Sequence, residues 1–231
     1  MSQTQTVLPE ESSTNSRSHE MGAQTLYDKC MALASNMWWA WNPEVINLFR
    51  DLDPIRWRQL DHNPIALLKE FTPARLESRA TEMVLYSRIH HAYRQLKAYV
   101  SSNRPTWATM HAGVLGAKPV AYFSAEFGIH ESVPIYSGGL GVLSGDHIKS
   151  ASGLGLPLVA IGLFYDQGYF KQRLDEEGYQ VEEYMDTRVD NLPLKPVLDD
   201  NGQQLTISID TRTGKLLARV WLMFVGRVRL Y

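Results

Sequence analysis

The sequence predicts an α/β protein with an N-terminal all-helical domain, followed by the beginning of a parallel sheet. Apolar residues recur at intervals of three or four as far as about residue 105, which is the spacing of helices that bury one face. Two short apolar runs then flank a helical segment, and strand, helix and strand in this order predict a parallel βαβ unit. A glycine-rich stretch lies directly before that helical segment.

The composition is that of a globular protein without strong charge. The chain has 231 residues, 44% of them hydrophobic, and a formal net charge of −2. This balance gives no electrostatic reason to expect nucleic acid or a membrane surface as a partner. No stretch approaches the ~20 apolar residues of a membrane span. The single cysteine, Cys30, cannot form an internal disulfide, which favours a cytoplasmic location.

Residues 1–20 are polar and rich in Ser, Thr, Gln and Glu. They lack the apolar segment of a signal peptide. We therefore expect a disordered tail here.

The helical domain is predicted over residues 21–110. After a first helix, four short helices begin where Asn, Asp or Thr precedes proline, because such a residue caps a helix and proline fits its first position. These pairs stand at residues 42–43, 53–54, 63–64 and 72–73. Trp38 and Trp41 share the apolar side of the first helix, which favours a role in the core over sugar stacking.

The second domain is predicted over residues 111–231. Strands are expected at 118–124 and 156–165, with a hairpin formed by 204–210 and 217–226 around Thr213-Gly214. The helix between the first two strands should end at Gly153 and Gly155. Its expected inward residues are Leu140, Leu143, His147, Ile148 and Ala151. The last residues read as a strand with an unpaired apolar edge, as in the front part of a longer protein.

The glycine-rich stretch contains Gly138, Gly139 and Gly141 and fits neither the GxGxxG fingerprint nor a P-loop. A bare turn before a helix presents main-chain N–H groups and the positive end of the helix dipole, which is an anion site. The alternative is a tight turn in which the glycines only permit close packing. The spacing by itself leaves both open.

Two further carboxylates are candidates because they follow the strands, where ligands bind in open α/β sheets. Glu126 either lines a cleft or caps a loop. Asp166, after Tyr165, could approach a substrate. The sequence contains no evident nucleophile–base pair and no metal-ligating constellation, so no metal is expected.

Residues 121–184, from AYFSAEFG to QVEEY, resemble the N-terminal catalytic domain of bacterial α-glucan (glycogen or maltodextrin) phosphorylases. Residues 33–68 resemble the helical domain that precedes it. The resemblance implies a truncated Rossmann-like domain of the GT-B fold. It also implies a glycosyltransferase that cleaves terminal α-1,4-glucosidic bonds with inorganic phosphate to give glucose 1-phosphate, using pyridoxal phosphate as cofactor.

By the same resemblance, the N–H of Gly139 meets the substrate phosphate and the N–H of Leu140 faces the sugar. We expect Gly138 to bind the phosphate as well, and Glu126 and Asp166, from their places after the strands, to bind the substrate. Most sugar contacts and the lysine that forms the Schiff base belong to the family's C-terminal domain. No catalytic set is therefore complete in this chain, and we expect it to need that domain for activity. Gly128 stands where the animal enzymes have an aromatic residue.

Two alternatives stay open. Glycogen or starch synthases share the GT-B fold, but a Lys-Thr pair precedes their glycine loop, where this chain has Tyr136 and Ser137. The missing cation argues against a sugar nucleotide. The other alternative is a non-catalytic protein that binds glucan or a partner subunit. Glucan preference and oligomeric state do not follow from the sequence.

Overall fold

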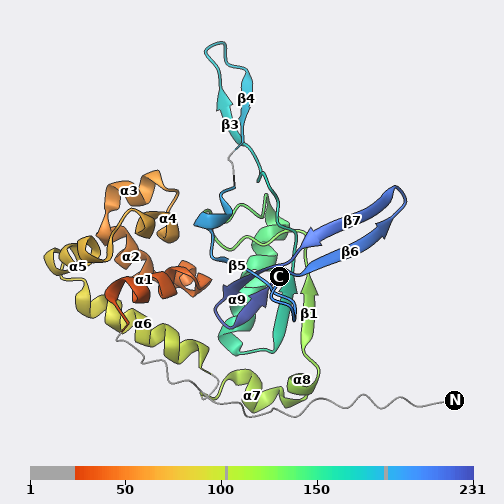
Figure 1. Cartoon of the computed structure of the whole chain (residues 1–231), viewed down its shortest axis with the longest axis horizontal. Helices are drawn as coiled ribbons and strands as arrows, with labels where there is room; N and C mark the ends of the chain where they lie inside the picture. The colour runs from red at the N-terminus through yellow and green to blue at the C-terminus, as the bar shows by residue number, and fades with distance from the viewer. Residues whose placement is uncertain (1–23, 102–103, 185–186) are drawn as a thin grey trace.

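The computed structural model describes residues 24–101, 104–184 and 187–231. The predicted tail at 1–20 lies outside these residues. Figure 1 shows a group of helices beside a central sheet, with two hairpins projecting from the body. The structure is thus a mixed α/β fold, as predicted.

The N-terminal part is helical. Its elements are α1 (Leu26–Ala34), the 3-10 helix η1 (Met37–Trp41), α2 (Pro43–Leu52), α3 (Pro54–Gln59), α4 (Pro64–Lys69), α5 (Pro73–Glu82), α6 (Tyr86–Val100), α7 (Trp107–His111) and α8 (Gly113–Ala117). Each helix from α2 to α5 begins at a proline, and the side chain before it accepts main-chain N–H bonds. The four predicted helix starts are confirmed. Among the described residues, no helix is long and apolar enough to cross a bilayer.

The first predicted helix is divided into α1 and η1 at Ser35 and Asn36. The Asn36 side chain accepts the N–H of Trp38, and the chain tightens into a 3-10 turn. Trp38 is buried, and Trp41 packs half-buried against the core, which confirms their packing role. Trp39 is the most buried of the three, at 1% exposed. Its burial was not predicted because the 3-10 turn does not follow the α-helical period.

The central sheet has the order β1-β2-β9-β8-β5. Its strands are β1 (Val120–Phe123), β2 (Leu158–Ile161), β5 (Leu194–Pro196), β8 (Trp221–Val225) and β9 (Val228–Leu230). β1, β2 and β9 are parallel, whereas β8 runs antiparallel to both β9 and β5. Helix α9 (Gly139–Leu154) connects β1 to β2, so the predicted βαβ unit is confirmed. A short 3-10 turn, η2 (Val189–Asn191), precedes β5.

Two hairpins stand apart from the sheet (Figure 1): β3 (Lys171–Leu174) with β4 (Gln180–Glu183), and β6 (Thr206–Thr211) with β7 (Gly214–Arg219). The second is the hairpin predicted around Thr213-Gly214. The predicted strand 217–226 is divided at Val220, however. Its first part closes the hairpin and its second part is β8, which joins the central sheet.

The expectation of an unpaired edge at residues 225–231 is wrong. Gly226, with a φ of 62°, reverses the chain between β8 and β9. β9 then inserts between β8 and β2 and pairs with both, while Val228 and Leu230 are buried. The edge strands of this sheet are β1 and β5.

Helix α9 packs on a different face from the predicted one. Leu140 and Leu143 are 54% and 66% exposed, and His147 is exposed as well. Ile148 and Ala151 are buried as predicted, and the other buried residues of the helix are Gly141, Ser144, Gly145 and Ser152. The face of α9 that carries these small residues points inward, because the helix lies against the main chain of Gly128. A Cβ at residue 145 would stand 2.0 Å from the Gly128 carbonyl oxygen. Large side chains cannot enter so close a contact.

The end of α9 was predicted in part. Gly155 adopts the left-handed conformation, with a φ of 69°, and closes the helix. Gly153 lies within the last turn and does not end the helix.

One hydrophobic cluster extends from the helices into the sheet. Asn36 also joins the two parts directly: its side-chain amide donates to the carbonyl of Gly226 at 3.0 Å and accepts the Gly226 N–H at 2.9 Å. A domain boundary at residues 110–111 stays a prediction.

Candidate functional site

The glycine-rich stretch forms the entrance to α9. Gly138 is the N-cap, and its carbonyl accepts the N–H of Val142. Among the described residues, the N–H groups of Gly139 and Leu140 have no hydrogen-bond acceptor. Together with the dipole of a 16-residue helix, such free donors suit an anion.

The Glu126 carboxylate caps the loop before this helix. It accepts the Ser137 hydroxyl at 2.7 Å, the Ser137 N–H at 3.1 Å and the Gly138 N–H at 3.4 Å. The hydrogen bonds from Ser137, followed by those from main-chain N–H groups, lower the pKa of Glu126 below its usual value of 4.5. Of the two predicted phosphate-binding glycines, Gly138 thus directs its N–H at Glu126.

The glycines of the loop differ in what surrounds them. A Cβ at Gly141 would stand 2.4 Å from the Cβ of Tyr136, so packing requires glycine at this position. A Cβ at Gly138 or Gly139 would meet no atom within 4 Å, and neither residue has a positive φ. Protein contacts therefore explain Gly141 and leave Gly138 and Gly139 unexplained.

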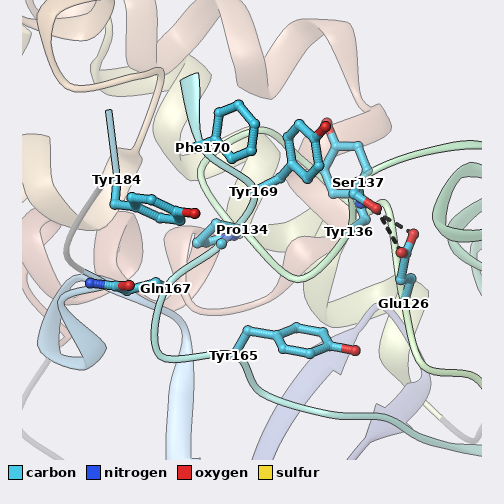
Figure 2. A pocket seen from close by; sticks show the side chains of 10 residues that line it. Glu126, Pro134, Tyr136, Ser137, Tyr165, Gln167, Tyr169, Phe170 and Tyr184 are labelled. Atoms are coloured by element: carbon cyan, nitrogen blue, oxygen red, sulfur yellow. Dashed lines mark hydrogen bonds between the residues drawn. The ribbon is translucent and has the colours of Figure 1, made fainter. Parts of the chain in front are cut away.

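A cavity of about 420 Å³ opens beside Glu126 and Ser137. Half of the residues that line it are aromatic, and Figure 2 shows their side chains around the cavity. Tyr169 stacks on Phe170, with ring centroids 4.7 Å apart and planes 17° apart, and Phe170 lies 5.7 Å from Tyr184. The Tyr165 hydroxyl donates to the carbonyl of Ala125 at 3.0 Å. The remaining lining residues are Pro134, Tyr136, Gln167 and Gly168.

The structure brings together only some of the predicted site residues. Glu126 lines the cavity, and Gly138 contacts Glu126. Asp166 is exposed and lies between the lining residues Tyr165 and Gln167, but it does not line the cavity itself.

Three residues of the cavity were not predicted as site residues: Tyr169, Phe170 and Tyr184. The feature of the sequence that could have indicated them is the concentration of aromatic residues between positions 164 and 184. These residues come from the loop after β2 and from the ends of the β3–β4 hairpin, segments that no periodicity joins.

The loop, the helix entrance and the aromatic cavity define a candidate site for an anion beside a flat, partly apolar ligand. A family described as "Protein of unknown function (DUF3417)" matches residues 26–133. The chain is 42% identical over 204 residues to glycogen phosphorylase of Mycobacterium tuberculosis, covering 86% of this chain and 23% of that protein.

Two further relatives are also phosphorylases. The chain is 38% identical over 206 residues to maltodextrin phosphorylase of Thermococcus litoralis, and 36% identical over 199 residues to glycogen phosphorylase of Aquifex aeolicus. Each match covers 86% of this chain, but only 24% and 28% of the relatives. These matches confirm the resemblance: the chain is homologous to glycogen and maltodextrin phosphorylases and spans about a quarter of their length.

Proposed function

We propose that this chain supplies the phosphate-contacting part of an α-glucan phosphorylase. Such an enzyme transfers a terminal glucosyl unit from an α-1,4-glucan to inorganic phosphate and releases glucose 1-phosphate. The parallel strands β1 and β2 with α9 would be the start of a Rossmann-like domain of the GT-B fold. The homology to glycogen and maltodextrin phosphorylases supports both statements.

The open space at Gly139 carries this proposal. Nothing in the described structure prevents a side chain there, and yet the position is glycine. A ligand that approaches the main chain would explain the bare backbone. The free N–H groups of Gly139 and Leu140 would then face phosphate and sugar, where fixed donors stabilise charge that develops during the reaction.

Glu126 has a positioning role in this proposal. Its bonds to Ser137 and Gly138 hold the loop, so that the next two N–H groups point outward from a fixed backbone. The carboxylate would also repel an anion placed against Gly138. We therefore assign the phosphate to the N–H of Gly139 and the sugar to the N–H of Leu140, and reserve Gly138 for the loop.

The aromatic cavity is suited to the glucan. Glucose rings have apolar faces that pack on aromatic side chains, and hydroxyl groups at their rim that need polar partners. The aromatic rings for this packing would come from Tyr169, Phe170 and Tyr184. The polar partners for the hydroxyl groups would be Glu126 and Gln167. Asp166 stays a proposed substrate contact from the mouth of the cavity.

Pyridoxal phosphate is the cofactor that this function requires, and the described residues by themselves do not fit it. No lysine is among the described residues that line the cavity beside Glu126, so none is placed there to hold the cofactor. We propose that the lysine and the cofactor site come from a C-terminal catalytic domain. A cytoplasmic location is part of the proposal, supported by the free, buried Cys30.

A sugar-nucleotide transferase is less consistent with the cavity. Such a donor brings a diphosphate, and neither Lys nor Arg is among the residues that line the cavity. The proposed function is tested by joining this chain to the part of the Mycobacterium tuberculosis glycogen phosphorylase that it does not cover. With phosphate and maltodextrin, the joined enzyme should release glucose 1-phosphate. Failure of the folded, cofactor-loaded enzyme to do so would refute the proposal.

A further inference from the structure

The turn between α3 and α4 has an unusual backbone conformation. Asp61 and His62 have φ angles of 49° and 55°, in the left-handed region that few residues other than glycine adopt. The turn is closed by the His62 N–H, which donates to the carbonyl of Trp57 at 2.9 Å. Such strain persists only where the surrounding structure holds it, and it is concentrated at functional sites. The two residues therefore call for a role that their contacts should show.

Both side chains of this turn reach segments that form the aromatic cavity. The Asp61 carboxylate pairs with Lys171 Nζ at 3.5 Å. His62 donates from Nδ1 to the Glu131 carboxylate. Lys171 begins β3, and Glu131 belongs to the loop between β1 and α9. One short turn of the helical part thus contacts two separate segments of the cavity wall.

Lys171 lies at the base of the β3–β4 hairpin, between two aromatic residues of the cavity. Phe170 directly precedes it in the chain. Across the hairpin Lys171 is paired with Glu183, and Tyr184 follows directly. The rings of Phe170 and Tyr184 lie on the same side of the cavity (Figure 2), with centroids 5.7 Å apart. A contact that holds Lys171 therefore helps to hold both rings.

The contact to Glu131 acts on the same aromatic residues through Pro134. Pro134 lines the cavity and packs closely on Gly168, where a Cβ would stand 2.7 Å from the Cβ of Pro134. Gly168 directly precedes Tyr169, which stacks on the next ring of the chain. The stacked pair is thus bounded by Gly168 on one side and Lys171 on the other, and the α3–α4 turn acts on both.

We propose that Asp61 and His62 are positioning residues for glucan binding, which hold the aromatic rings of the cavity in one arrangement. This inference rests on the proposed function of the cavity. Neither residue lines the cavity itself. The side chains of Asp61 and Lys171 are about half exposed, and exposed ion pairs contribute little to folding stability. The helical part would therefore affect the affinity for glucan more than the stability of the fold.

The test measures kcat and the KM for maltodextrin with the joined enzyme. Asp61→Gly with His62→Gly removes both side-chain contacts, and glycine suits the left-handed turn. The KM should rise about two- to fivefold, which is the range of an exposed ion pair. The kcat should stay near the parent value because the lost contacts serve binding alone. The unfolding midpoint should also stay near that of the parent, whereas a purely structural role would lower it.

Val84→Gly is the matched control. Val84 also has a positive φ, of 53°, and its side chain is 77% exposed. It does not line the cavity, so the variant should keep the parent KM. An equal rise of the KM in this control would overturn the inference, because the effect would then come from added glycine and not from the two contacts.

Variants of Lys171 test the ion pair from its other side. Lys171→Gln should raise the KM, and Lys171→Arg, which keeps the charge, should restore it. Added to the Asp61→Gly and His62→Gly variant, Lys171→Gln should raise the KM no further, because the residues act through one contact. A further rise of the same size would show that Lys171 acts independently of the turn, and would overturn the inference.

Hydrogen exchange of the full 231-residue chain separates this inference from the proposed function. Loss of the two contacts should speed exchange of the amides of residues 168–174, because they open locally more often. Unchanged exchange would overturn the inference, and so would an active joined enzyme in which the Asp61→Gly and His62→Gly variant keeps the parent KM. An inactive joined enzyme with the parent sequence would refute the proposed function and the glucan role with it, while the exchange rates would still decide whether the turn holds the hairpin.

Discussion

Helix α9 meets the chain after β1 through two glycines: Gly145 lies directly against the main chain of Gly128. A Cβ on Gly145 would stand 2.0 Å from the Gly128 carbonyl oxygen. The same segments are joined by a hydrogen bond from the Gly128 N–H to the carbonyl of Gly141, at 2.7 Å. This contact sets the height of the helix above the sheet, and with it the position of the helix entrance.

Gly145→Ala should therefore destabilise the chain by about 1–3 kcal/mol, because overpacking forces the helix away from the segment after β1. Denaturant unfolding of the full chain measures it. Gly153→Ala is the matched control, since a Cβ there meets no atom within 4 Å and the residue is helical. It should be neutral or stabilise by about 0.5–1 kcal/mol. Equal stability of the two variants would contradict the close contact.

Asn36→Ala should destabilise the chain by about 1–3 kcal/mol. It removes the cap of η1 and leaves the buried peptide of Gly226 without partners. Thermal and denaturant unfolding would both detect the change. Asn201→Ala replaces an exposed asparagine in a turn and should stay within about 0.5 kcal/mol of the parent. An unchanged Asn36 variant would mean that the helices and the sheet do not depend on this link.

The carboxyl pKa of Glu126 should lie below 4.5 in the folded chain, because the ionised form accepts three hydrogen bonds. A lowered pKa means that this contribution to stability is present above pH 4.5. It is lost as the pH falls through the lower, folded value. Carbon NMR of the labelled carboxyl group measures the titration.

Ser137→Ala removes the hydroxyl that makes the shortest of these bonds, so it should move the Glu126 pKa back toward 4.5. A pKa at or above 4.5 in the parent, unaffected by this substitution, would show that Glu126 does not hold the loop.

Local features of the chain were predictable from the sequence. Asn42, Asp53, Asn63 and Thr72 each cap a helix that starts at the next proline, and this depends only on neighbouring residues. The parallel pairing of β1 with β2 followed from strand, helix and strand spacing.

Features that depend on distant contacts were not predictable. The insertion of β9 between β2 and β8 joins segments about 70 residues apart. The inward face of α9 is set by the backbone of Gly128 and not by the large residues Leu140 and Leu143, so hydrophobic periodicity gave the wrong face. The aromatic cavity combines the loop before α9 with the β3–β4 hairpin region.

The most direct test of the proposed function is the rate of phosphorolysis by a Gly139→Val variant of the joined enzyme described above. The new side chain enters open space, so the folding stability and cofactor content should change little. The rate should fall about a hundred- to thousandfold, as for the loss of one preorganised donor. Gly153→Val, which also adds its side chain in open space, should keep the parent rate. A Gly139→Val enzyme with the parent rate would contradict the assignment of this backbone to the substrate phosphate.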